Sequence, residues 1–99
     1  MSTNIDPKTL NEQGKEAFQS GELDTAVDSF RAAAEAYAFA HDDPNAAESK
    51  NNLSVALLQS GKAQESLDAT LGTDDIFAKA GDLKRQGMAL ENQAAASRL

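Results

Sequence analysis

The sequence predicts an all-α protein built as a solenoid of helical hairpins. Three observations predict this fold. Apolar residues recur at a three-four spacing, helix start and stop signals alternate along the chain, and the chain repeats itself after a shift of forty positions. Only two prolines occur and β-branched residues are scarce, which argues against a sheet. The length of 99 residues suits one domain.

The first half of the chain contains signals for two helices. Asp6 and Pro7 have the residue types of an N-cap and a first helical position, so we expect a helix from Pro7 to about Ser20, ended by Gly21. We expect residues 1–6 to form a disordered tail and residues 7–99 to form the domain. A second helix is predicted from Glu22 to about His41. Its buried stripe consists of Leu23, Ala26, Val27, Phe30, Ala33, Ala34 and Tyr37.

The second half repeats these signals. Asp43-Pro44 predicts the start of a third helix, which ends at Ser60-Gly61. A fourth helix is predicted for residues 62–80, and Gly81-Asp82 ends it and caps a fifth helix from Leu83 onward. Gly72 interrupts the fourth helix, and we expect it to let a neighbouring helix pack closely rather than to cause a kink. Connections of two to three residues make successive helices antiparallel neighbours.

The repeat of forty positions divides the chain into residues 7–43, 44–82 and a half repeat, 83–99. A period of two helices is typical of solenoids, in which each hairpin buries its face against its neighbours. The matching pairs are Asn11 and Asn51, Ser20 and Ser60, Gly21 and Gly61, Asp28 and Asp68, Ala38 and Ala78, Ala40 and Ala80, Asp42 and Asp82, Asn52 and Asn92, and Ala56 and Ala96.

The first repeat has small and apolar residues at regular positions, namely Gly14, Ala17, Gly21, Leu23, Ala26, Phe30 and Ala33. With these residues at the spacing of the family consensus, residues 8–99 resemble the tetratricopeptide-repeat family. The second matches at Leu53, Leu57, Gly61 and Ala63, with Ser66 and Thr70 where Ala and Phe are expected. The resemblance is to a long-helix variant, because the period exceeds the usual 34 residues by about six. It implies a right-handed solenoid of five antiparallel helices, or two and a half repeats, in which small residues such as Gly14 let the second helix pack close.

The resemblance also implies a concave groove lined by the first helix of each repeat. Asparagine side chains in such a groove can hydrogen-bond an extended peptide backbone, and the alternative is that this surface is merely solvated. The implied groove residues are Asn11, Lys15, Phe18, Asn51, Asn52, Val55, Leu58, Gln59, Glu91, Asn92, Ala95 and Arg98.

The last predicted helix is too apolar for a cap that faces water. Its apolar residues are Met88, Leu90, Ala94, Ala95, Ala96 and Leu99. Two explanations are open: the chain is a fragment of a longer repeat array, or two copies bury their C-terminal ends together as a homodimer.

The composition indicates the class of function. A net charge of −7 disfavours nucleic-acid partners and favours basic or neutral ones. The chain has one histidine, no cysteine and no phosphate-binding glycine loop, so we expect no enzyme, no metal site and no cofactor; His41 is expected to lie at a helix C-terminus, where it favours the helix dipole. No signal peptide or membrane-inserting segment is recognisable, and we expect a cytoplasmic protein.

The sequence therefore predicts a non-catalytic scaffold that binds a peptide or a helix of another protein. A self-associating structural module and a docking fragment of a larger protein are the alternatives.

Overall fold

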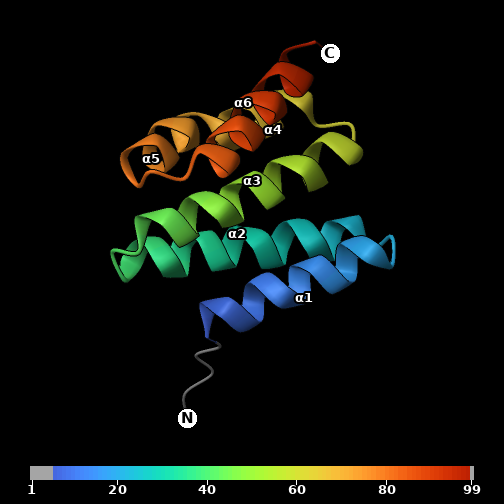
Figure 1. The fold of residues 1–99 in the computed structure, drawn as a ribbon. Helices are drawn as coiled ribbons and strands as arrows, with labels where there is room; N and C mark the ends of the chain where they lie inside the picture. The colour runs from blue at the N-terminus through green and yellow to red at the C-terminus, as the bar shows by residue number, and fades with distance from the viewer. Residues whose placement is uncertain (1–5, 99) are drawn as a thin grey trace.

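The computed structural model describes residues 6–98, and this part of the chain contains six helices and no strand. The prediction of an all-α fold is therefore confirmed for these residues, and none of their helices is long and apolar enough to cross a membrane. Apart from Asp6, the predicted N-terminal tail lies outside the described residues, as does Leu99. The helices are α1 (Pro7–Gln19), α2 (Leu23–Phe39), α3 (Asp43–Gln59), α4 (Ala63–Thr70), α5 (Thr73–Lys79) and α6 (Leu83–Ser97) (Figure 1).

Aspartates begin three of these helices. The Asp6 side chain accepts a hydrogen bond from the backbone N–H of Lys8 at 3.2 Å, with Pro7 in the first turn, as predicted. Asp82 caps α6 in the same way, at 3.0 Å from the backbone nitrogen of Arg85. The predicted cap at Asp43 is wrong by one residue, because Asp42 accepts from the backbone N–H of Asn45 at 3.4 Å and Asp43 already belongs to α3.

Glycines end most of the helices. Gly21, Gly61 and Gly81 have φ angles of 80°, 80° and 74°, which confirms the predicted breaks. The connection after α2 differs, because His41 takes the same left-handed conformation with a φ of 61°. α2 ends at Phe39, so His41 follows the helix instead of ending it.

The predicted fourth helix is two helices, α4 and α5, separated at Leu71 and Gly72. Gly72 has a φ of 86°, and no atom outside its chain neighbours lies within 4 Å of the position a Cβ would take. Our prediction that Gly72 permits close packing is therefore wrong, and its role is to turn the backbone. Leu71, directly before this turn, is 61% exposed.

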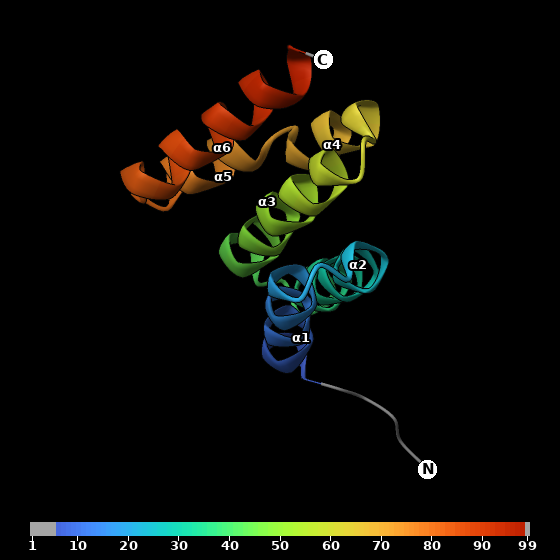
Figure 2. The ribbon, with the colours of Figure 1, turned by 90° about the vertical axis from the view of Figure 1, so that its right-hand side faces the viewer.

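The helices pack mainly on their neighbours in sequence. α1 packs on α2 and α2 on α3, while α4 and α5 both pack on α3 and α6. α3 contacts each of the other five helices, and α1 and α6 lie at opposite ends of the molecule (Figures 1 and 2). One core cluster joins Phe30 of α2 to Leu53 and Leu57 of α3, and a second joins Phe77 of α5 to alanines of α3 and α6.

The two hairpins use different residues where their helices cross. A Cβ on Gly14 would lie 2.6 Å from the ring of Phe30, so only glycine fits beneath that ring. Forty residues later the equivalent pair is Ser54 and Thr70, both almost fully buried. The Ser66 hydroxyl donates to the Ser54 carbonyl oxygen at 2.8 Å in this second hairpin. At this crossing the first hairpin pairs a glycine with a phenylalanine. The second hairpin pairs a serine with a threonine, whose side chains are similar in size.

Candidate functional site

A crevice between α1 and α3 gathers part of the predicted groove. It contains two hollows, both of which Lys15 lines. The apolar hollow has a volume of about 170 Å³ and is lined by Lys15, Phe18, Gln19, Phe30, Asn52 and Val55. The polar hollow has a volume of about 330 Å³ and is lined by Lys8, Asn11, Glu12, Lys15, Tyr37, Asn45 and Glu48. We call the two together the α1–α3 crevice.

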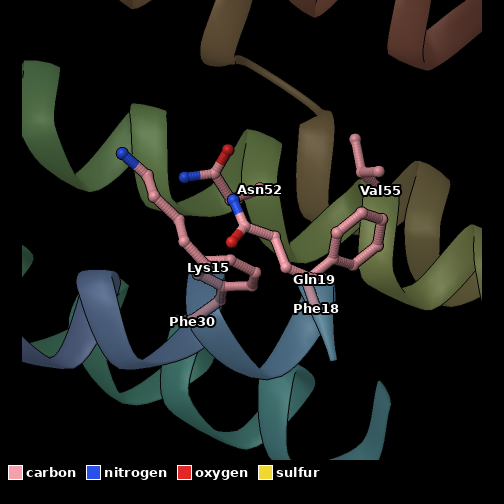
Figure 3. Close-up of a pocket in the computed structure, with 6 residues that line it drawn as sticks. All are labelled: Lys15, Phe18, Gln19, Phe30, Asn52 and Val55. Atoms are coloured by element: carbon pink, nitrogen blue, oxygen red, sulfur yellow. The ribbon is translucent and has the colours of Figure 1, made fainter. Parts of the chain in front are cut away.

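Helical spacing brings the walls of the apolar hollow together. Lys15, Phe18 and Gln19 lie within about one turn on one face of α1, and Asn52 and Val55 are three residues apart on α3. Figure 3 shows the α1 side chains projecting toward α3, with the Phe30 ring of α2 below them. The hollow therefore has an aromatic and aliphatic interior with one ammonium group and two amides at its edge.

A hydrogen-bonded cluster joins α1 and α3 beside the hollows. Asn11 is buried, and its Oδ1 atom accepts from the Ser49 hydroxyl at 3.0 Å and from Nδ2 of Asn52 at 3.4 Å. Because the helices are held by these bonds, the crevice exists before any ligand arrives. Asn11, a predicted groove residue, lines the polar hollow, and its amide oxygen already has two donors inside the protein.

Asn51, the equivalent of Asn11 in the second repeat, is also buried. Its Oδ1 atom lies 3.1 Å from the hydroxyl of Thr73, which belongs to α5. The Thr73 hydroxyl also lies 2.8 Å from the Thr70 carbonyl oxygen, so it has two acceptors for its proton. Asn51 therefore joins α3 to the break between α4 and α5 and does not line an open groove.

Tyr37 makes the polar hollow electrostatically distinct. Its pKa is raised above the usual 10.0, first because the phenol is partly buried and then because the carboxylates of Asp6, Asp42, Glu48 and Glu12 disfavour a phenolate. Glu12 and Glu48 also line this hollow. Lys8 and Lys15 line the polar hollow as well, so its two carboxylates face two ammonium groups, whereas the apolar hollow has only the Lys15 ammonium in its lining.

The structure brings together four of the predicted groove residues, namely Lys15, Phe18, Asn52 and Val55, in the apolar hollow. The other predicted residues outside Asn11 and Asn51 line neither hollow. They lie near the end of α3 or on α6 and are Leu58, Gln59, Glu91, Asn92, Ala95 and Arg98.

Sequence reasoning missed Gln19 as a site residue and treated Phe30 as core alone. The helical spacing from Lys15 to Gln19 is a signal that could have found the first. Phe30 is 3% exposed and belongs to the first core cluster, yet its ring also lines the apolar hollow. No local pattern distinguishes this double role.

Within residues 6–98, no group of three or more His, Asp or Glu side chains is placed to hold a metal ion. No protein-family model matches the chain, and neither the curated proteins nor the solved structures contain a match. The resemblance to tetratricopeptide repeats therefore rests on the residues of the sequence itself.

Proposed function

We propose that this protein is a non-catalytic interaction module that holds an extended peptide segment of another protein in the α1–α3 crevice. The observation that carries the proposal is the apolar hollow, with Phe18, Phe30 and Val55 around a space of about 170 Å³. Cavities of about 150 Å³ can hold a benzene-sized apolar group. One large apolar side chain, such as leucine or phenylalanine, would fill this hollow.

The polar hollow suggests what else the peptide carries. Glu12 and Glu48 line it, and carboxylates raise the pKa of Tyr37 there. Lys8 and Lys15 also line this hollow, so the preference for a basic residue depends on the carboxylates around Tyr37 and on the net charge of −7, which would speed the approach of a lysine or arginine. The proposed ligand is thus an apolar residue followed or preceded, within a few residues, by a basic one.

The proposal includes the architecture that the family resemblance implies, a tetratricopeptide-like solenoid of hairpins. The close approach of Gly14 to the Phe30 ring supports it, since small residues at this crossing are what the resemblance requires. The order of helix packing, with α3 between the first hairpin and the later helices, supports it as well.

Selection from a library of short random peptides tests the proposed function. We expect enriched peptides to combine one large apolar residue with a nearby lysine or arginine. Val55→Glu should abolish their binding, because it places a carboxylate beside Phe18 and Phe30. Leu71→Glu is the matched control, since Leu71 is an exposed apolar residue that lines neither hollow.

Replacing both carboxylates of the polar hollow by lysines tests the basic residue separately. A variant with Glu12→Lys and Glu48→Lys should enrich acidic peptides in place of basic ones, with the apolar residue retained. If the selected peptides bind the Val55→Glu variant as tightly as they bind the parent, the crevice is not the binding site. Failure of any peptide to enrich would rule out the proposed function.

A further inference from the structure

The outer face of α6 carries a regular stripe of uncharged residues that no other helix of the described chain covers. The stripe is Leu83, Gly87, Leu90, Ala94 and Ser97, and every member is exposed. Leu83 and Leu90 are 74% and 47% exposed. Successive members are four, three, four and three residues apart, which is the spacing of a coiled-coil seam.

A different face of α6 accounts for how the helix is attached to the protein. Ala89 and Ala96 are buried there, and Nε2 of Gln93 donates to the Thr70 carbonyl oxygen at 3.0 Å and to Asp74 at 2.9 Å. α6 lies at the outer edge of the molecule, with α4 and α5 on its inner side (Figure 2). The exposed stripe is therefore a second apolar face on a helix whose first face is already used.

We propose that this stripe, the α6 stripe, binds the same stripe of a second copy of the chain in antiparallel orientation. The argument is shape complementarity. With Leu90 of one copy opposite Gly87 of the other, Leu83 comes opposite Ala94, so each leucine faces a small residue. Apart from its chain neighbours and the nearby backbone of α6, no described atom lies within 4 Å of a Cβ position on Gly87, which leaves room for the incoming leucine. A parallel pair would place leucine against leucine and glycine against glycine.

Charge complementarity supports the same register. Lys84 and Glu91 are exposed, and each directly follows a leucine of the α6 stripe. In the antiparallel register Lys84 of one copy lies beside Glu91 of the other, and two-fold symmetry makes this contact twice. A close pair of ions at each end of a short apolar seam offsets part of the repulsion between two chains of net charge −7. The interface is small, so we expect a dissociation constant in the micromolar range.

Solution mass by light scattering over a concentration series tests the dimer with the full chain. We expect the mass to rise from 10.4 kDa toward twice that value with concentration. Leu90→Glu should weaken the dimer more than a hundredfold, because it places two carboxylates in an apolar seam. Since Leu90 faces solvent in the single chain, helix content by circular dichroism should not change. Leu71→Glu adds the same charge at another exposed leucine and should leave the mass unchanged.

Charge reversal tests the orientation. Lys84→Glu alone and Glu91→Lys alone should each weaken the dimer, roughly tenfold, by turning two attractions into two repulsions. The double variant should restore the parent affinity, because each pair then has opposite charges again. Equal dimer affinities for the parent, the two single variants and the double variant would overturn the antiparallel register. A single-chain mass up to millimolar concentration, or a dimer indifferent to Leu90→Glu, would overturn the proposal.

This inference is independent of peptide binding in the α1–α3 crevice. Leu90→Glu should leave the binding of selected peptides unchanged, and Val55→Glu should leave the mass unchanged. The two proposals can therefore fail separately.

Discussion

Within residues 6–98, His41 is the one residue other than glycine whose backbone has a positive φ. It has a φ of 61°, whereas glycines occupy the corresponding position of three other connections. This conformation costs a residue with a Cβ roughly 1–2 kcal/mol. Glycine avoids this cost, but its greater conformational freedom in the unfolded chain offsets part of the resulting stabilisation. We therefore expect His41→Gly to raise the free energy of unfolding by about 1 kcal/mol.

Urea denaturation of the variant measures this difference. Gly81→His is the matched control, because Gly81 lies forty residues after His41 and has a φ of 74°. It should lower the free energy of unfolding by a similar amount. A His41→Gly variant no more stable than the parent would show that the side chain of His41 compensates for the strain.

We expect Tyr37 to make the free energy of unfolding depend on pH in the alkaline range. Because its pKa is raised in the folded protein, the unfolded chain loses the phenol proton first, from about pH 10 upward. The stability that depends on the protonated phenol is therefore complete below pH 10 and is lost as the pH rises through the folded pKa. Tyr37 is the only tyrosine, so its absorbance reports the titration directly.

The Tyr37→Phe variant is the control for this prediction. Between pH 10 and the folded pKa, the free energy of unfolding should fall more for the parent than for the variant. Below pH 10, the free energies of the two proteins should change with pH in parallel. A midpoint at or below 10 in the folded protein would contradict the environment that surrounds the phenol.

At the scale of helical elements, the two hairpins should not exchange single residues freely. Gly14→Ser in the parent forces a side chain into the Phe30 ring, and overpacking of this kind costs about 1–3 kcal/mol. In a Phe30→Thr background the same change creates the pair that the second hairpin has, Ser54 and Thr70. We expect Gly14→Ser to cost much less there. A double-mutant cycle from denaturation measures the coupling, and simple additivity would contradict it.

Sequence patterns predicted the helices well where the signal is local. Proline, aspartate caps and glycine ends lie within a few residues of the feature they specify, and only the choice between adjacent Asp42 and Asp43 went wrong. Gly72 was ambiguous, because a glycine inside a helical pattern suits both a close packing contact and a left-handed turn. Its φ depends on where α5 packs against α3 and α6, which local sequence does not contain.

The candidate site was predicted in part for a similar reason. The family resemblance implied Lys15, Phe18, Asn52 and Val55 as groove residues, and these four line the apolar hollow. Asn11 was expected in the open groove because the family resemblance implied that position. Its partner Ser49 comes from a helix 38 residues away, and only that long-range contact makes burial of the amide favourable.

For the whole molecule, α3 should be the most stable part. It contacts all five other helices and contributes eight buried residues, whereas α1 and α6 lie at the two ends. Local unfolding that releases α1 or α6 leaves most of α3 covered, but α3 cannot open unless its neighbours separate. Hydrogen exchange should therefore be slowest for amides in the middle of α3. Equal protection of all six helices would indicate a single cooperative unit instead.

The core also determines how stability responds to temperature. Within residues 6–98, Phe77 and Leu57 are the only large apolar side chains that are less than 2% exposed, and the other residues of that group are threonines and serines. Exposing apolar surface raises the heat capacity on unfolding, and exposing polar surface lowers it. The heat-capacity change of this protein should therefore fall below the typical value of about 12–15 cal/mol/K per residue. Its free energy of unfolding then follows a flat curve against temperature, so the protein loses stability gradually both on warming and on cooling.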